Sequence, residues 1–164
     1  TSGAVSAGKF DFVPSVVNNF KLSNYFKSVA IRPGKPVLFA KIKGKQKAIF
    51  GLPGNPISSA ACFRFFVYPY LRNLLGIKEE TSFKATLKNK FIKKKNFTRF
   101  VKSKLSTTKN GKLEVQILKG QESFRIRSFI QSNIWVLLPS GKEKFKKGEV
   151  VDCFFPNQSN KIFL

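Results

Sequence analysis

Histidine and methionine are absent from this sequence, and cysteine is scarce. Without an imidazole the chain has no Ser-His-Asp triad, no Cys-His pair and no histidine general base. Its two cysteines, Cys62 and Cys153, are too few for a thiolate zinc site, and their spacing is not that of a secreted disulfide scaffold. We therefore expect a reducing, cytoplasmic compartment and a chemistry that needs neither imidazole nor thiolate.

Long apolar runs are also missing. The most apolar stretch, residues 57–75, is interrupted by Arg64, Arg72 and several polar side chains, so we expect no membrane span. No signal-peptide pattern is visible, and the chain opens without a methionine on Thr1-Ser2-Gly3-Ala4, a turn of small residues. We expect on this ground that the sequence is the C-terminal part of a longer protein.

Acidic residues are few: eight Asp and Glu stand against 31 Lys and Arg, and the formal net charge is +23. Lys and Arg release counterions from phosphates, so one interpretation is a basic nucleic-acid-binding module. The other is a lysine-rich composition with solvated faces, which the even spread and the absence of an arginine cluster favour. Under either interpretation, small anionic ligands are attracted.

The character of the sequence changes near residues 76–82, and we place a domain boundary between residues 78 and 79. Residues 1–78 alternate short apolar runs with helical patterns around glycine-proline loops, which is typical of α/β layers. Residues 79–164 contain alternating segments and turn signals, which predict a small β-rich, barrel-like domain. Three strands and two helices are few for a complete α/β domain, so we expect residues 1–78 to be part of one.

The apolar spacing also predicts the individual elements. Helices are expected over residues 11–20 and 57–75, with Asn55 as the N-cap of the second helix and Gly76 at its end. Strands are expected at 26–31, 37–42, 47–50, 83–92, 98–106, 113–118, 134–138 and 150–155. A short helix is expected within 123–133, and Asn110-Gly111 predicts a hairpin turn.

The loop Gly51-Leu52-Pro53-Gly54-Asn55-Pro56-Ile57-Ser58 leads from a strand into the long helix. A terminal glycine permits a close approach to the backbone, and a helix start offers N–H groups and positive potential to an anion. Ser58 would add a hydroxyl donor. The alternative is a rigid connector that binds nothing, and the residues alone do not decide between the two.

Two further loops carry polar or charged groups. In Arg32-Pro33-Gly34-Lys35-Pro36 two cations flank a turn, where they could converge on one anion or remain solvated. Residues 1–11 bring hydroxyls and glycines suited to phosphate oxygens, and end at Asp11, the only carboxylate of residues 1–78. Asp11 fits an ion pair, a favourable helix-start charge or a metal ligand equally well.

In this order and spacing, residues 3–11, 32–36 and 51–58 resemble the molybdopterin molybdenumtransferase (MoeA) family, which includes the E domain of gephyrin. The runs Ser-Asn-Ile-Trp-Val-Leu-Leu-Pro at 132–139 and Gly-Glu-Val-Val at 148–151 resemble the C-terminal β domain of that family. The resemblance implies an α/β fold: part of a three-layer, MogA-like molybdopterin-binding domain at 1–78, followed by a small barrel-like β domain at 79–164.

The resemblance also implies an activity, the insertion of molybdate into adenylylated molybdopterin with release of AMP. It implies a Mg²⁺ ion, a cytoplasmic homodimer, and a chain that is inactive without the N-terminal domains of the family. The catalytic residues would be Asp11, Arg32 and Lys35, with Asp11 also the metal ligand. The substrate-binding residues would be Gly3, Ser6, Gly8, Pro53, Gly54, Asn55, Pro56, Ser58 and, from the β domain, Ser123.

Three other functions remain as alternatives to this enzyme. They are the nucleic-acid-binding module, a scaffold role of the gephyrin type, and a related adenylyltransferase of the same α/β fold. The additional β domain argues against the adenylyltransferase.

Overall fold

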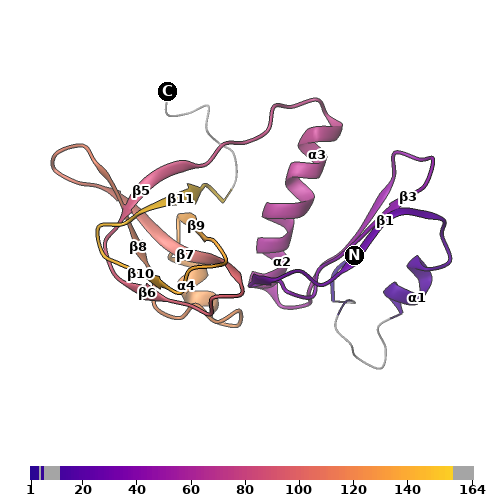
Figure 1. The fold of residues 1–164 in the computed structure, drawn as a ribbon, viewed down its shortest axis with the longest axis horizontal. Helices are drawn as coiled ribbons and strands as arrows, with labels where there is room; N and C mark the ends of the chain where they lie inside the picture. The colour runs from indigo at the N-terminus through magenta and orange to yellow at the C-terminus, as the bar shows by residue number, and fades with distance from the viewer. Residues whose placement is uncertain (4, 6–11, 157–164) are drawn as a thin grey trace. The chain divides into compact units, whose positions relative to one another are not determined.

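The computed structural model describes residues 1–3, 5 and 12–156. The chain divides into two compact units, Thr1–Lys78 and Glu79–Leu164 (Figure 1). Among the described residues, no helix is both long enough and apolar enough to cross a membrane.

The first unit is a three-stranded antiparallel sheet between helices, in the strand order β1-β3-β4 (Figure 1). Its strands are β1 (Leu22–Lys27), β3 (Leu38–Ile42) and β4 (Ala48–Gly51), and a two-residue strand, β2 (Ile31–Arg32), precedes β3. Its helical segments are α1 (Val13–Val17), α2 (Pro56–Cys62), the π-helical turn η1 (Phe63–Val67) and α3 (Tyr68–Leu74).

The alternation of β3 explains the layering. Leu38 and Ala40 are buried in one cluster with Val17 of α1, so they face that helix. The ring of Phe39 points to the other face, where its centroid lies 6.1 Å from that of Tyr70 in α3. Phe50 of β4 contacts the same tyrosine ring at 5.3 Å. The sheet therefore has α1 on one face and the long helix on the other, as an α/β layer fold requires.

The expected long helix is present as one run of α2, η1 and α3, and both of its expected caps are confirmed. The Asn55 side chain accepts a hydrogen bond from the Ile57 N–H at 3.3 Å, with Pro56 in the first turn. Gly76, at φ +64°, donates to the Asn73 carbonyl at 3.1 Å, and the Ile77 N–H donates to Arg72 at 2.9 Å. This pair of bonds is a Schellman closure.

The π turn was not expected from sequence. It ends just before Pro69, whose ring has no N–H and would crowd the carbonyl four residues earlier in a regular α-helix. A widened turn at this place accommodates the proline without ending the helix.

Two predictions in the first unit are wrong in extent. The strand expected at 26–31 is instead β1 at Leu22–Lys27, because the backbone reverses at Ser28, which has φ +87°. The helix expected at 11–20 is observed only as Val13–Val17; residue 11 lies outside the described residues, and the helix stops at Asn18. Asparagine side chains compete for backbone hydrogen bonds, so Asn18-Asn19 ends the helix early.

The second unit contains a closed five-stranded barrel. Its strands are β5 (Phe83–Leu87), β7 (Thr98–Thr107), β8 (Leu113–Ile117), β9 (Ile134–Leu138) and β11 (Val150–Phe154). They follow the order β7-β8-β5-β11-β9, and β9 pairs back onto β7. Among the described strand pairs of the barrel, β5 and β8 are parallel and the other four pairs are antiparallel.

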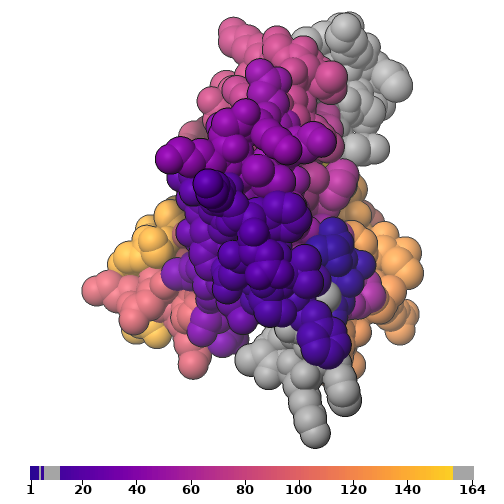
Figure 2. All heavy atoms as spheres, turned by 90° about the vertical axis from the view of Figure 1, so that its right-hand side faces the viewer, coloured from indigo at the N-terminus to yellow at the C-terminus, as the bar shows by residue number. Residues whose placement is uncertain are grey.

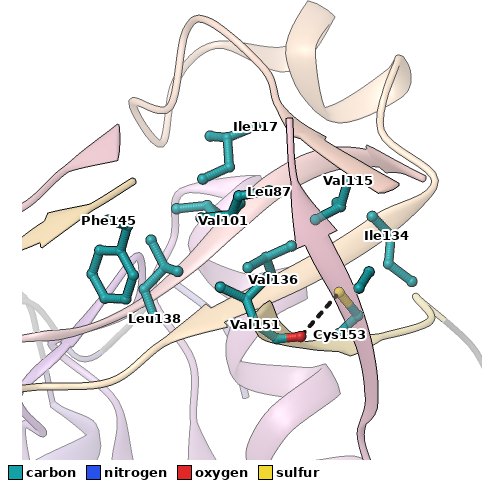
Figure 3. Close-up of a cluster of buried hydrophobic side chains, with 11 residues drawn as sticks. Leu87, Val101, Val115, Ile117, Ile134, Val136, Leu138, Phe145, Val151 and Cys153 are labelled. Atoms are coloured by element: carbon teal, nitrogen blue, oxygen red, sulfur yellow. Dashed lines mark hydrogen bonds between the residues drawn. The ribbon is translucent and has the colours of Figure 1, made fainter. Parts of the chain in front are cut away.

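Alternate residues of each barrel strand point inward and form one apolar core (Figure 3). Its buried members are Ala85, Leu87, Val101, Val115, Ile117, Ile134, Val136, Leu138, Phe145, Val151 and Cys153. The hairpin between β7 and β8 turns at Gly111, with φ +74°, and this confirms the prediction from Asn110-Gly111.

The remaining elements of this unit are β6 (Phe91–Ile92), β10 (Lys144–Phe145) and the short helix α4 (Ile126–Ile130). Helix α4 confirms the helix expected within 123–133. The strand expected at 83–92 is wrong, because it is split into β5 and β6. Between them the Asn89 side chain donates to the Ile117 carbonyl at 3.1 Å and accepts from its N–H at 2.9 Å. The side chain thus continues the strand ladder while the main chain turns away.

Candidate functional site

The antiparallel register of the first sheet brings two of the candidate loops to one edge. Leu38, the first residue of β3, pairs with Gly51, the last residue of β4. The segment that enters β3, residues 32–37, and the segment that leaves β4, residues 52–56, therefore lie at the same end of the sheet.

The N-terminal residues join this edge through a parallel bridge between Ser2 and Leu52. The Gly3 N–H donates to the Leu52 carbonyl at 3.1 Å. A Cβ on Gly54 would lie 3.2 Å from the Gly3 Cα, so the two glycines are in direct backbone contact. The glycine-rich N-terminal loop and the Gly51–Ser58 loop therefore touch.

The glycine at the end of β4 does permit a close approach, as the sequence predicted. A Cβ on Gly51 would lie 2.3 Å from Cγ1 of Val5 and 3.1 Å from Cβ of Leu38. The group that approaches is thus the Val5 side chain, which is buried in the core beneath the loop.

The Arg32–Pro36 turn lies against the start of the long helix. Gly34 has φ +102°, and a Cβ on it would lie 2.4 Å from Sγ of Cys62 and 3.5 Å from the Ser58 carbonyl oxygen. The Cys62 thiol donates to the Gly34 carbonyl at 3.5 Å. Burial raises the pKa of Cys62 to about 12, so the thiol is neutral and serves packing rather than nucleophilic chemistry.

The edge of the sheet therefore combines a helix start with two cationic side chains. Ser58 is 6% exposed on the first helical turn, and Asn55 caps that turn. Arg32 and Lys35 are exposed in the turn that packs on the same part of the helix. Residues 12–78 contain no Asp or Glu, so the described part of this unit presents only positive formal charge around the helix start. Chemically, this arrangement suits an oxyanion.

Several expected site residues meet at this edge, and others do not. Those that meet are Gly3, Arg32, Lys35, Pro53, Gly54, Asn55, Pro56 and Ser58. Ser6, Gly8 and Asp11 lie outside the described residues. Ser123 belongs to the second unit, in the turn before α4, so the first unit does not include it.

The residues that the structure describes hold no group of three or more His, Cys, Asp or Glu placed to bind a metal ion. A metal in the first unit would therefore depend on Asp11, the only carboxylate of residues 1–78.

A residue that the sequence analysis missed is Lys102 in β7. It is 1% exposed, and its ammonium donates to the carbonyls of Gly120, Glu122 and Arg125 at 2.7, 3.1 and 3.3 Å. Desolvation by burial lowers the pKa of this lysine, while the charge of Glu122 acts in the opposite direction. Strand alternation places Lys102 on the outside of the barrel, where a lysine is normally solvated, so the sequence carries no signal of its burial.

The loop that covers Lys102 also borders a cavity of about 410 Å³. Residues lining it include Lys119, Gly120, Glu122, Arg125, Arg127 and Ser128. The Ser128 hydroxyl donates to the Gly120 carbonyl at 2.6 Å, which ties α4 to the same loop.

Comparison with known proteins covers both units. Residues 1–73 match the family profile described as a probable molybdopterin binding domain, and residues 84–154 match the MoeA C-terminal region (domain IV). A Staphylococcus aureus (strain COL) protein named molybdopterin molybdenumtransferase is 36% identical over 155 residues, which are 93% of this chain and 36% of that protein. A Staphylococcus epidermidis protein of the same name is 34% identical over 162 residues, covering 98% and 38% of the two chains.

A solved structure agrees with these matches. The molybdopterin biosynthesis moeA protein from Pyrococcus horikosii superposes with a TM-score of 0.67 at 30% identity, covering 90% of this chain and 35% of that one. This similarity confirms the expected fold class, an α/β unit followed by a β-barrel. The chain spans little more than a third of the length of the curated relatives that it matches.

Proposed function

Because this chain belongs to the molybdopterin molybdenumtransferase family, we propose that its protein inserts molybdate into adenylylated molybdopterin and releases AMP. One observation carries the proposal: three loops far apart in sequence meet at one edge of the first sheet, around a helix start and two cations. The proposed substrates, molybdate and a pyrophosphate-linked pterin, are both oxyanions, which is the ligand class that this edge suits.

The residues of the edge would act by positioning and by electrostatic stabilisation. Cleavage of the pyrophosphate bond develops negative charge on phosphate oxygens, and Arg32 and Lys35 would compensate it, the first as a planar fork and the second as a point charge. The N–H groups at the helix start and the Ser58 hydroxyl would orient an oxyanion. Gly3 would leave the backbone open to the ligand, because nothing lies within 4 Å of its Cβ position, whereas the missing side chain of Gly54 makes room for the Gly3 backbone.

The described residues of the first unit offer no carboxylate to a magnesium ion. Mg²⁺ is usually bound by one or two carboxylates, substrate phosphates and water. In the first unit only Asp11 offers a carboxylate, and it lies outside the described residues. We propose that Asp11 is the magnesium ligand, as the family resemblance implies.

We further propose a cytoplasmic homodimer, with Ser123 contributing to substrate binding. What supports association is a set of exposed apolar side chains in and beside α1, on the side of the first unit that faces the viewer in Figure 2. Phe12, Val16 and Phe20 are 63%, 54% and 44% exposed there. Large exposed apolar side chains that lie close together are typical of interfaces.

The proposal is tested by neutralising one cation of the edge in the intact protein. We expect Lys35→Gln to lower the turnover of adenylylated molybdopterin with molybdate by about 100-fold, the loss typical of one electrostatic contact to a transition state. Lys45→Gln is the matched control, because Lys45 is an exposed turn lysine at the opposite end of β3 and should leave turnover unchanged.

Two results would contradict the proposal. One is equal activity of the two glutamine variants. The other is wild-type protein that has no affinity for the pterin but binds a random oligonucleotide with a steep salt dependence, which would favour the nucleic-acid-binding module.

A further inference from the structure

We infer that Lys102 is a positioning residue, whose buried ammonium holds the loop of residues 120–125 and, with it, Ser123 in a binding-competent shape. The part of the inference that concerns Ser123 rests on the proposed function. The part that concerns the loop rests on the geometry of the second unit alone.

The three carbonyls that accept from Lys102 surround Ser123 in sequence. The oxygens of Gly120, Glu122 and Arg125 lie 2.7, 3.1 and 3.3 Å from Nζ. An ammonium has three N–H donors, so these bonds use its whole donor capacity. One cation therefore fixes the backbone on both sides of Ser123.

The main chain of Lys102 holds the same loop. Its N–H donates to Oε1 of Gln121 at 3.0 Å, and its carbonyl accepts from Nε2 of Gln121 at 2.7 Å. The Gln121 amide also donates to the Leu118 carbonyl at 2.8 Å. Lys102 of β7 therefore binds the loop through two sets of hydrogen bonds, one made by its backbone and one made by its ammonium group.

A direct role of Lys102 in binding substrate does not fit this geometry. The side chain is 1% exposed, and its three donors are already used inside the protein. An apolar side chain in its place would remove one donor from each of the three carbonyls. The Glu122 carbonyl would keep the Arg125 N–H at 3.1 Å, but Gly120 and Arg125 share the single hydroxyl hydrogen of Ser128, at 2.6 and 2.9 Å, so one of these two carbonyls would be left without a donor. An unpaired backbone carbonyl shielded from water is costly, so the loop should open to regain a hydrogen bond with water.

The test compares two buried lysines of the second unit in the intact protein. Lys93 is 4% exposed, and its ammonium donates to the carbonyls of Phe97 at 2.7 Å and Lys94 at 3.4 Å, in a different loop. We expect Lys102→Met to speed amide hydrogen exchange in residues 119–128 at least tenfold and to leave residues 94–98 unchanged. Lys93→Met should do the reverse.

The functional arm measures kcat and KM for the proposed reaction. Lys102→Met should lower kcat/KM to the same extent as Ser123→Ala, and the double variant should lose no more than either single one. Lys102→Arg, which retains a cation with several donors, should restore both exchange protection and turnover. Lys93→Met should leave kcat/KM of the folded protein unchanged.

Unaltered exchange in 119–128 in Lys102→Met would overturn the inference, and so would an opened loop with turnover intact while Ser123→Ala is impaired. If wild-type protein shows no molybdenumtransferase activity, the proposed function fails. The exchange comparison still decides the positioning role in that case.

Discussion

Gly34 is the residue on which the packing of the Arg32–Pro36 turn depends most directly. Its φ of +102° is strained for any residue with a side chain, and its Cβ position is 2.4 Å from the Cys62 sulfur. A real Cβ there would force the turn away from the helix. The turn that carries Arg32 and Lys35 can therefore pack against the helix start only because Gly34 has no side chain.

We expect Gly34→Ala to lower the free energy of unfolding by about 2–5 kcal/mol, the sum of left-handed strain and overpacking. Urea denaturation followed by circular dichroism measures it. The control is Gly44→Ala in the β3–β4 turn, which has φ +72° but nothing within 4 Å of its Cβ. Gly44→Ala should lower the free energy of unfolding only by the left-handed strain, about 1–2 kcal/mol.

A double-mutant cycle separates the clash from the strain. Cys62→Ala removes the sulfur that Gly34→Ala would meet, so the alanine at position 34 should cost less in that background. A cost that is the same in both backgrounds would show that the contact with Cys62 is not the cause.

At the scale of elements, the long helix serves two purposes with the same first turn. Asn55 caps it through the Ile57 N–H at 3.3 Å, and the same turn carries Ser58 at the edge where the loops meet. Asn55 therefore affects both the stability of the helix and the proposed anion binding. A negative charge at this position should affect the two differently.

Asn55→Asp separates the two purposes. Aspartate and asparagine cap helices about equally well, and a negative charge is favourable at the positive end of the helix dipole. We expect the free energy of unfolding to stay within about 0.5 kcal/mol of wild type. The affinity for molybdate or the adenylylated pterin should fall at least tenfold, because the new charge repels an anion.

Asn55→Ala is the counterpart of this variant. It removes the cap without adding charge, so it should cost about 1 kcal/mol of stability. Calorimetric titration with molybdate and urea denaturation on all three proteins measure both quantities. An aspartate variant that binds the anion as tightly as wild type would place the anion away from this helix start.

At the scale of the whole molecule, the two units differ in how completely they bury their strands. The barrel closes on itself, because β9 pairs with both β11 and β7, and it has an apolar core of its own. The first unit has a sheet of three strands, in the order β1-β3-β4, which does not close on itself. A closed barrel has no edge strands, whereas an open sheet leaves its outer strands exposed.

We therefore expect residues 79–164, expressed alone, to unfold cooperatively in urea with a sigmoidal transition. Residues 1–78 expressed alone should aggregate or show no cooperative transition, because their apolar faces are insufficiently covered. Circular dichroism of both pieces, with size-exclusion chromatography, checks this. A monomeric, cooperatively unfolding 1–78 would contradict it.

The sequence correctly predicted those features that depend only on residues adjacent in the chain. The cap at Asn55, the Schellman closure at Gly76 and the hairpin at Asn110-Gly111 each need only a few adjacent residues with particular backbone preferences. The short strand 26–31 was misplaced because its apolar run lacks a clear period. The reversal at Ser28 has no sequence signal, since a serine with φ +87° is unusual.

The sequence by itself determined which residue types are available: glycines, hydroxyls and cations in three loops, no histidine, and one carboxylate in residues 1–78. Only the tertiary structure decided which of them meet, because that depends on the pairing of Leu38 with Gly51 and on the contact of Gly34 with Cys62. It also decided the burial of Lys102, since a strand pattern records which face a side chain points to, and not what later covers that face.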